Sequence, residues 1–167
     1  MEIELNNVKL VSYDDSNNKH KSLLMNFSNE SKSNYIQDIE IRLTSSNNKK
    51  SGVFDRGFIA SSNDECFGYV FISKLIKDEM FLEISILKEC RGKGLGKILL
   101  EEVSEYIISN YNVKSIILDI DPSNIASVMT ALSCGYMEDE DEYLKRNMNG
   151  KILYRMDNYN YINKRKK

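Results

Sequence analysis

Three glycines and three cations lie within the seven residues Arg91–Lys97, which read Arg-Gly-Lys-Gly-Leu-Gly-Lys. The segment falls between a predicted strand and a predicted helix, where unpaired N–H groups and the helix dipole favour an anion. Glycine lets the backbone approach a phosphate because no side chain stands in the way. The segment therefore predicts a phosphate-binding loop, to which Arg91, Lys93 and Lys97 add positive charge.

Other phosphate-binding patterns fit this loop less well. A Walker loop needs Ser or Thr directly after Gly-Lys, whereas Gly96-Lys97 is followed by Ile98. A dinucleotide fingerprint, G-x-G-x-x-G, would require glycine at position 97, and it normally follows the first strand of its unit rather than the fourth. A glycine-rich connection without a ligand is the remaining alternative, but a tight turn rarely needs three glycines and three cations.

A carboxylate suited to acid–base chemistry precedes the loop. Along a strand, alternate residues share a face, so Glu83 and Ser85 point to a cleft if Ile84 and Ile86 point into the core. Glu83 could then take a proton from an amine or attract a cationic substrate. A solvated glutamate at a strand end is the alternative, and Asp119 is a weaker candidate of the same kind.

The sequence contains few residues suited to hydrolytic catalysis or to metal binding. His20 is the single histidine and stands in a polar run, which predicts a surface position rather than a place in a hydrolase triad. The three cysteines, Cys66, Cys90 and Cys134, are widely spaced and form no CxxC pair. We therefore expect no metal site.

The apolar pattern predicts a mixed α/β domain without internal repeats. We expect two short helices within residues 19–43, a helix from 98 to 111 and another from 125 until Gly135 ends it. We expect strands over residues 8–13, 53–60, 66–72, 81–87, 115–120, 143–148 and 151–156. The last two strands flank Asn149-Gly150, a dipeptide typical of a hairpin turn.

Composition limits the class of protein. The 167 residues contain only 8 Gly and 1 Pro, which excludes collagen-like and low-complexity chains. A chain of this length predicts one domain, which we place over residues 1–157, with a basic tail over residues 158–167. The net charge of −2 provides no basic field for nucleic acid. No apolar run suits a membrane span and no signal peptide is evident, so we expect a cytoplasmic protein.

The loop and its surroundings resemble the GCN5-related N-acetyltransferase (GNAT) superfamily. Arg91–Gly96 fits the pattern R/Q-x-x-G-x-G/A, and Ile86 lies five residues before it, where the family has a Val or Ile. Asn124–Ser127 and Cys134–Tyr136 are similar to the family landmarks N-x-A-S and L-G-F. The resemblance extends from about Phe81 to Tyr136, and the N-x-A-S form is similar to ribosomal-protein N-terminal acetyltransferases.

The resemblance implies a fold, a co-substrate and an assembly. The fold would be a mixed, mostly antiparallel sheet of about seven strands with flanking helices, splayed at strands 4 and 5. Acetyl-CoA would be the co-substrate, with its pyrophosphate on the glycine loop, and a homodimer would be expected. The residues implied in cofactor binding are Ile86, Leu87, Arg91, Gly92, Lys93, Gly94, Leu95, Gly96, Lys97, Asn124 and Ser127.

The resemblance also implies direct transfer of an acetyl group to a primary amine. A backbone N–H of Ile86 or Leu87 would hold the thioester carbonyl. Glu83 is the candidate base and Ser85 a weak catalytic candidate. The acceptor stays open between a small-molecule amine and a protein or peptide amine, and a non-catalytic CoA-binding sensor or a generic nucleotide-binding module are alternative functions.

The chain departs from the family pattern at the general acid. Ala131 occupies the position, seven residues after the motif Asn, where many members have Tyr. The proton for the leaving thiolate could then come from water, Ser127, Ser133 or a tyrosine of the C-terminal region. The acidic run Glu138–Glu142 is interpreted as a solvated loop or, alternatively, as an attraction for a polycationic substrate.

Overall fold

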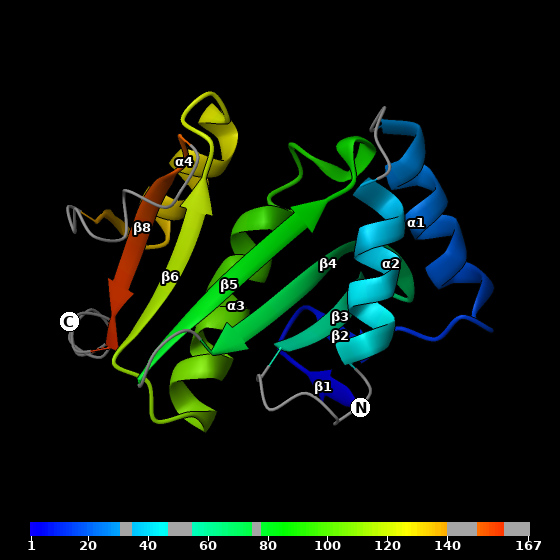
Figure 1. Ribbon diagram of the computed structural model, residues 1–167, viewed down its shortest axis with the longest axis horizontal. Helices are drawn as coiled ribbons and strands as arrows, with labels where there is room; N and C mark the ends of the chain where they lie inside the picture. The colour runs from blue at the N-terminus through cyan, green and yellow to red at the C-terminus, as the bar shows by residue number, and fades with distance from the viewer. Residues whose placement is uncertain (31–34, 47–54, 75–77, 140–149, 159–167) are drawn as a thin grey trace.

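The computed structural model describes residues 1–30, 35–46, 55–74, 78–139 and 150–158. Within these ranges one mixed sheet has eight strands in the order β1-β2-β3-β4-β5-β6-β8-β7 (Figure 1). The strands are β1 (Glu2–Glu4), β2 (Lys9–Ser12), β3 (Asp55–Ser62), β4 (Glu65–Lys74), β5 (Glu79–Ile86), β6 (Ser115–Ile120), β7 (Met137–Glu138) and β8 (Ile152–Asp157). All neighbouring strands are antiparallel except β5 and β6, which are parallel.

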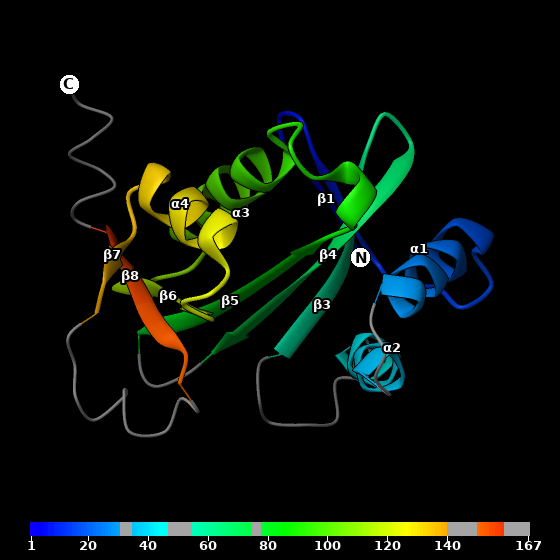
Figure 2. The same cartoon turned by 90° about the horizontal axis from the view of Figure 1, so that it is seen from above.

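Helices cover both faces of the sheet (Figure 2). They are α1 (Asn18–Glu30), α2 (Tyr35–Ser46), α3 (Leu95–Asn110) and α4 (Ile125–Ser133), with a short 3₁₀ turn, η1, over Lys88–Cys90. One buried core lies between α3 and the sheet, and a second one joins α1 and α2 to the opposite face. We call these two sides of the sheet the α3 face and the α2 face.

The predicted mixed α/β fold with flanking helices is confirmed, and two short strands are additional. β1 has three residues and β7 has two, which is too short for an alternating pattern to show in the sequence. Because β1 precedes the first predicted strand, the splayed pair is β5 and β6 in the structure. Strand β8 matches the second half of the predicted hairpin, whereas residues 143–148 lie outside the described residues.

The splay between β5 and β6 results from how few residues the two strands pair. Their register runs from Glu79↔Ser115 to Phe81↔Ile117 and stops there. Beyond it β5 continues along β4, and β6 continues along β8, to their ends. Each strand therefore follows its outer antiparallel partner, and an opening, which we call the split, widens between them (Figure 1).

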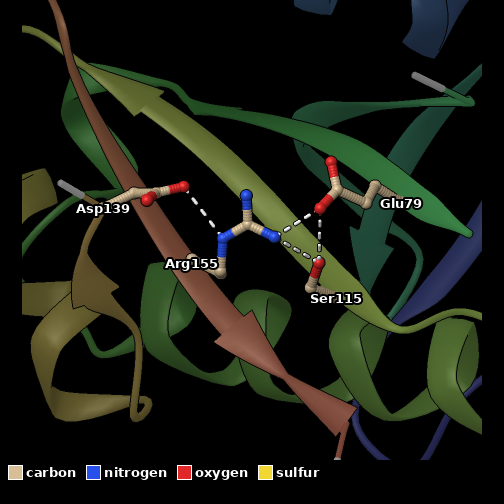
Figure 3. Close-up of polar contacts among 4 residues, drawn as sticks. All are labelled: Glu79, Ser115, Asp139 and Arg155. Atoms are coloured by element: carbon tan, nitrogen blue, oxygen red, sulfur yellow. Dashed lines mark hydrogen bonds and ion pairs between the residues drawn. The ribbon is translucent and has the colours of Figure 1, made fainter. Parts of the chain in front are cut away.

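A charged network fastens the closed end of the split on the α2 face (Figure 3). Arg155 on β8 donates from Nε to Asp139 Oδ2 at 2.8 Å, and from Nη1 to Ser115 Oγ at 2.7 Å and to Glu79 Oε1. Burial lowers the pKa of the guanidinium, but the hydrogen bonds to Glu79 and Asp139 raise it above its ordinary value overall. Asp139 is thus part of an ion pair rather than simply solvated, whereas residues 140–142 of the acidic run lie outside the described residues.

A buried carboxylate attaches the N-terminal hairpin to α3. The side chain of Glu102 is 8% exposed and accepts hydrogen bonds from the N–H groups of Asn7 and Val8, in the turn between β1 and β2, at 3.0–3.2 Å. The side-chain amide of Asn7 donates to it as well. Val8 is 2% exposed, so its N–H depends on Glu102 for an acceptor, whereas Asn7 lies at the surface.

Substituting Glu102 with Ala should lower the free energy of unfolding by about 1–3 kcal/mol, since it leaves the buried N–H of Val8 without its acceptor. Urea unfolding measures this change as a shift of the midpoint at an unchanged slope. The neighbouring Glu101, which is half exposed and 3.8 Å from Lys97, provides the control. Glu101→Gln should change stability by less than about 0.5 kcal/mol, and an equal loss in both variants would contradict the assignment.

The prediction that His20 lies at the surface is wrong. His20 is 4% exposed, and its Nδ1 accepts a hydrogen bond from the N–H of Asp14 at 3.1 Å. Its ring stacks on Tyr13 with centroids 5.9 Å apart. Burial lowers the pKa of His20, because the charged form would lose its contact with water, and this effect outweighs the opposite influence of Asp14. The polar residues around His20 hid the inward face of α1.

The lowered pKa of His20 makes the free energy of unfolding depend on pH. The unfolded chain binds a proton near the ordinary pKa of about 6.5, while the folded chain binds it only at a lower pH, so stability falls as the pH drops through that range. Urea midpoints measured from pH 7.5 to 5 should therefore fall less steeply for His20→Asn than for the parent protein. Parallel curves for the two proteins would show that His20 does not contribute.

Candidate active site

A cavity of about 820 Å³ occupies the split and extends to the start of α3. Its lining comes from α2, β5, the glycine loop, the first turns of α3 and α4, the end of β6 and the residue before β8. Both faces of the sheet contribute, because Ile84 and Ile86 pack on the α3 core while Glu83 lies on the α2 face. The cavity therefore connects the two sides of the sheet where β5 and β6 have separated.

The glycine loop has the backbone geometry of an anion cradle. Gly92 and Gly94 have φ values of +75° and +78°, which disfavour residues with a side chain, and a Cβ built on either would meet no atom within 4 Å. Gly94 is the N-cap of α3, and the helical ladder begins where Ile98 N–H donates to Gly94 O at 3.1 Å. The N–H groups of the first helical turn thus precede the ladder and lie beside open space.

Most residues predicted to bind a cofactor line this cavity. These are Ile86, Arg91, Gly92, Gly94, Gly96, Lys97, Asn124 and Ser127. Leu87, Lys93 and Leu95 do not line it among the described residues. Arg91 connects the loop to the strand, because its Nε donates to the backbone oxygen of Ile86 at 3.0 Å.

The structure distinguishes the two backbone N–H groups considered for a carbonyl. Leu87 N–H donates to Phe67 O at 2.9 Å, so the ladder between β4 and β5 already uses it. Alternate residues of an antiparallel strand direct their N–H groups to opposite neighbours. Ile86 N–H is therefore directed away from β4, into the split, and of the two it is the one placed to act as a donor there.

Asn124 and Ser127 line the cavity at the start of α4. Asn124 is the N-cap of this helix, and its Oδ1 accepts from Ser127 N–H at 3.2 Å. This capping bond gives the N-x-A-S segment a structural role as well. Ala131, at the position where the resemblance would place Tyr, is fully buried in the α3 core, so a proton donor has to come from elsewhere.

The hydroxyl groups considered as proton donors are placed very differently. Ser133 lies outside the cavity and donates to Thr130 O at 2.8 Å. Tyr154 is 5% exposed within the α3 core, and the other C-terminal tyrosines lie outside the described residues. Ser127 lines the cavity, as does Thr130, which sequence reasoning missed.

Glu83 points to the cavity on the α2 face, as the alternation predicted, and it is paired. Arg42 of α2 donates from Nη1 to Glu83 Oε2 at 2.7 Å. The same guanidinium lies over the ring of Phe71, with Cζ 3.7 Å from the centroid. A cation–π contact of this kind fixes the plane of the guanidinium as well as its position. Ser85, the weak catalytic candidate, also lines the cavity.

A second ion pair lies on the other side of the split. Lys151, just before β8, donates to Asp119 Oδ2 on β6 at 2.9 Å. Arg42 and Lys151 are the charged partners of these carboxylates, and the sequence did not indicate them because each is distant along the chain from the strand it contacts. A lone basic residue on a helix or in a turn has no pattern that would distinguish it from a solvated one.

Two further properties concern the whole described part of the chain. It contains no group of three or more His, Cys, Asp and Glu side chains placed to hold a metal ion. In the same ranges no helix has both the length and the apolar character that crossing a membrane requires.

The chain belongs to the Acetyltransferase (GNAT) family, whose sequence model matches residues 23–136. An uncharacterized N-acetyltransferase of Methanocaldococcus jannaschii is 26% identical over 81 residues, which are 48% of this chain and 52% of that protein. The chain thus spans about half the length of the curated relative it matches.

Solved structures share the fold over nearly the whole chain. The N-acetyltransferase PseH of Campylobacter jejuni, solved with acetyl coenzyme A, matches with a TM-score of 0.66 at 11% identity, covering 90% of this chain and 98% of that one. RimL, a ribosomal L7/L12 α-N-protein acetyltransferase solved with coenzyme A, matches with a TM-score of 0.69 at 12% identity, covering 94% and 98%. At these identities the likeness establishes the fold.

Substituting Gly94 with Ala should weaken acetyl-CoA binding about tenfold or more, because the added Cβ enters the cradle and strains the left-handed backbone. Titration calorimetry measures the dissociation constant. Gly150→Ala is the matched control, since Gly150 has a similar φ of +82° and open space around it but does not line the cavity. If both variants lost affinity for acetyl-CoA equally, the loss would be due to backbone strain and not to the Cβ in the cradle.

Proposed function

We propose that this protein is an acetyl-CoA-dependent N-acetyltransferase that transfers an acetyl group to a primary amine by direct attack. One observation carries the proposal: a single cavity joins the glycine loop, the N–H of Ile86 and the carboxylate of Glu83. Membership of the acetyltransferase family supports the reaction class. The glycine loop would bind one end of the co-substrate, and the split would receive its acetyl end.

The residues of the loop fit a pyrophosphate. Gly92 and Gly94 leave room that a Cβ would occupy, and the first N–H groups of α3 are suited to phosphate oxygens. Arg91 and Lys97 line the same cavity and add positive charge. Asn124 and Ser127 would contact the co-substrate from the opposite wall, at the start of α4.

Each catalytic task has a group in the split. When bound, acetyl-CoA supplies the acetyl group as a thioester, whose C–S bond breaks as the amine nitrogen forms the new C–N bond. Ile86 N–H would donate to the carbonyl oxygen where negative charge develops. Glu83 would accept the proton that the attacking amine loses, directly or through one water molecule. Ser127 or water would provide the proton for the sulfur.

Two measurements test the proposed function. Calorimetry should show acetyl-CoA binding more tightly than ATP or NAD, and free thiol should appear from acetyl-CoA when amines are added. Binding of ATP or NAD without acetyl-CoA would instead indicate a nucleotide-binding module. Acetyl-CoA binding without thiol release for any amine would indicate a non-catalytic sensor, the alternative that the buried Ala131 favours.

Glu83→Gln should lower kcat about 10²–10⁴-fold, because the amide keeps the shape of the carboxylate but cannot accept the amine proton. The dissociation constant of acetyl-CoA should stay unchanged, since Glu83 lies on the face away from α3. Stopped-assay thiol release measures kcat, and its pH profile should lose the limb due to the base. Glu4→Gln, in the N-terminal hairpin, serves as the control. Unchanged turnover and pH profile in Glu83→Gln would remove Glu83 as the base.

A further inference from the structure

Two ion pairs face each other across the split on the α2 face. Phe81 and Ile117 form the last pair of the parallel register, so Glu83 and Asp119, two residues further along each strand, stand at the same level on the same face. Glu83 is 25% exposed and Asp119 is 16% exposed. The split therefore has one partly buried carboxylate on each side.

Each of these carboxylates already has a cation beside it. Arg42 lies 2.7 Å from Glu83, and Lys151 lies 2.9 Å from Asp119. All four side chains line the cavity. With Asp121, which also lines the cavity at the end of β6, the acceptor side of the split carries charges of both signs rather than a field of one sign.

We propose that the acceptor is a small amphoteric molecule, an amino acid or a close analogue, with a carboxylate a few bonds from the amine. The inference rests on the proposed function and specifies its acceptor. The amine would lie between Glu83 and Asp119, where the split opens toward Ile86. The carboxylate of the acceptor would bind Arg42, with Lys151 as a second cation on the same face of the sheet.

The surroundings of Arg42 suit it to recognise a carboxylate. A guanidinium has five N–H donors in a planar fork, so it can hold Glu83 and a second carboxylate together. The ring of Phe71 fixes the plane of this fork, and the side chain of Arg42 is only 34% exposed. A charge that is held in place and partly shielded from water discriminates more strongly than a mobile surface charge.

The same arrangement disfavours a polycationic acceptor. A diamine or polyamine that placed one amine between Glu83 and Asp119 would bring its next ammonium group toward Arg42 or Lys151. Like charges in a partly desolvated cavity repel each other, and a second ammonium group offers neither Arg42 nor Lys151 a counter-ion. An acceptor with a carboxylate instead exchanges partners with the two existing ion pairs.

Matched acceptors that differ by one carboxylate test the inference. Lysine and cadaverine form one pair, and ornithine and putrescine form another. At saturating acetyl-CoA, thiol release should give a kcat/KM at least tenfold higher for the amino acid of each pair. Calorimetry on the CoA-bound protein should likewise detect the amino acid and not the diamine. Equal or higher values for the diamines would overturn the inference.

Arg42→Met tests the residue assigned to the carboxylate. It should raise KM for lysine at least tenfold, because the acceptor carboxylate loses its partner. KM for cadaverine should not rise, because a charge that repels its second ammonium group is removed, and the dissociation constant of acetyl-CoA should stay unchanged. Lys9→Met, which also removes a cation but lies in the N-terminal hairpin, should change none of these values. An equal rise of KM for both acceptors would mean that Arg42 acts through Glu83 alone, and would overturn the assignment.

Failure of the inference and failure of the proposed function have different signatures. Absence of acetyl-CoA binding would overturn the proposed function. Acetyl-CoA binding with turnover of diamines alone, or of peptides with a free N-terminus alone, would overturn the inference and leave the proposed function standing. Acetyl-CoA binding with no acetylation of lysine or ornithine would overturn the inference as well.

Discussion

Three residue pairs between β5 and β6 determine the geometry of the whole site. The parallel register ends at Phe81↔Ile117, and beyond it each strand keeps its antiparallel partner on the outer side. Arg155 fastens the closed end by joining β8 to Glu79 on β5 and to the start of β6. The two strands are therefore held together up to Phe81 and Ile117 and separate beyond these residues. A longer parallel register would fill the cavity with backbone hydrogen bonds and leave no place for a thioester or an amine.

The hydrogen bond from Leu87 N–H to Phe67 O fixes the phase of β5 within the sheet. In that phase the N–H of Ile86 is directed into the split, while the side chains of Glu83 and Ser85 face α2. A slip of one residue would exchange these roles, because it turns every side chain of the strand to the other face. Gly68, opposite Ile86 on β4, supports the phase, since a Cβ there would lie 2.3 Å from the backbone oxygen of Ser85. The proposed donor and base thus depend on one register.

Local pattern was enough to predict the mixed fold, the position of the glycine loop before α3 and the face of the sheet on which Glu83 lies. Each of these depends on residues adjacent in sequence or on simple alternation. Arg42 and Lys151 could not be predicted, because their roles come from α2 and the turn before β8 lying against strands far away along the chain. His20 failed for a related reason: its neighbours are polar, and only the packing of α1 on the sheet shows that it faces inward. The close approach at Gly68 likewise appears only once two strands are paired.

The sheet divides the proposed reaction between its two faces. The loop before α3 and the start of α4 would hold the co-substrate, and both are built mainly from backbone groups and caps that do not depend on the acceptor. The acceptor would meet side chains of α2, β5, β6 and the residue before β8 on the opposite face. Because the two sets share only the split, substitutions at Arg42 or Lys151 would alter the choice of acceptor without disturbing the glycine loop. In the proposed reaction, acceptor specificity would therefore be a property of the α2 face.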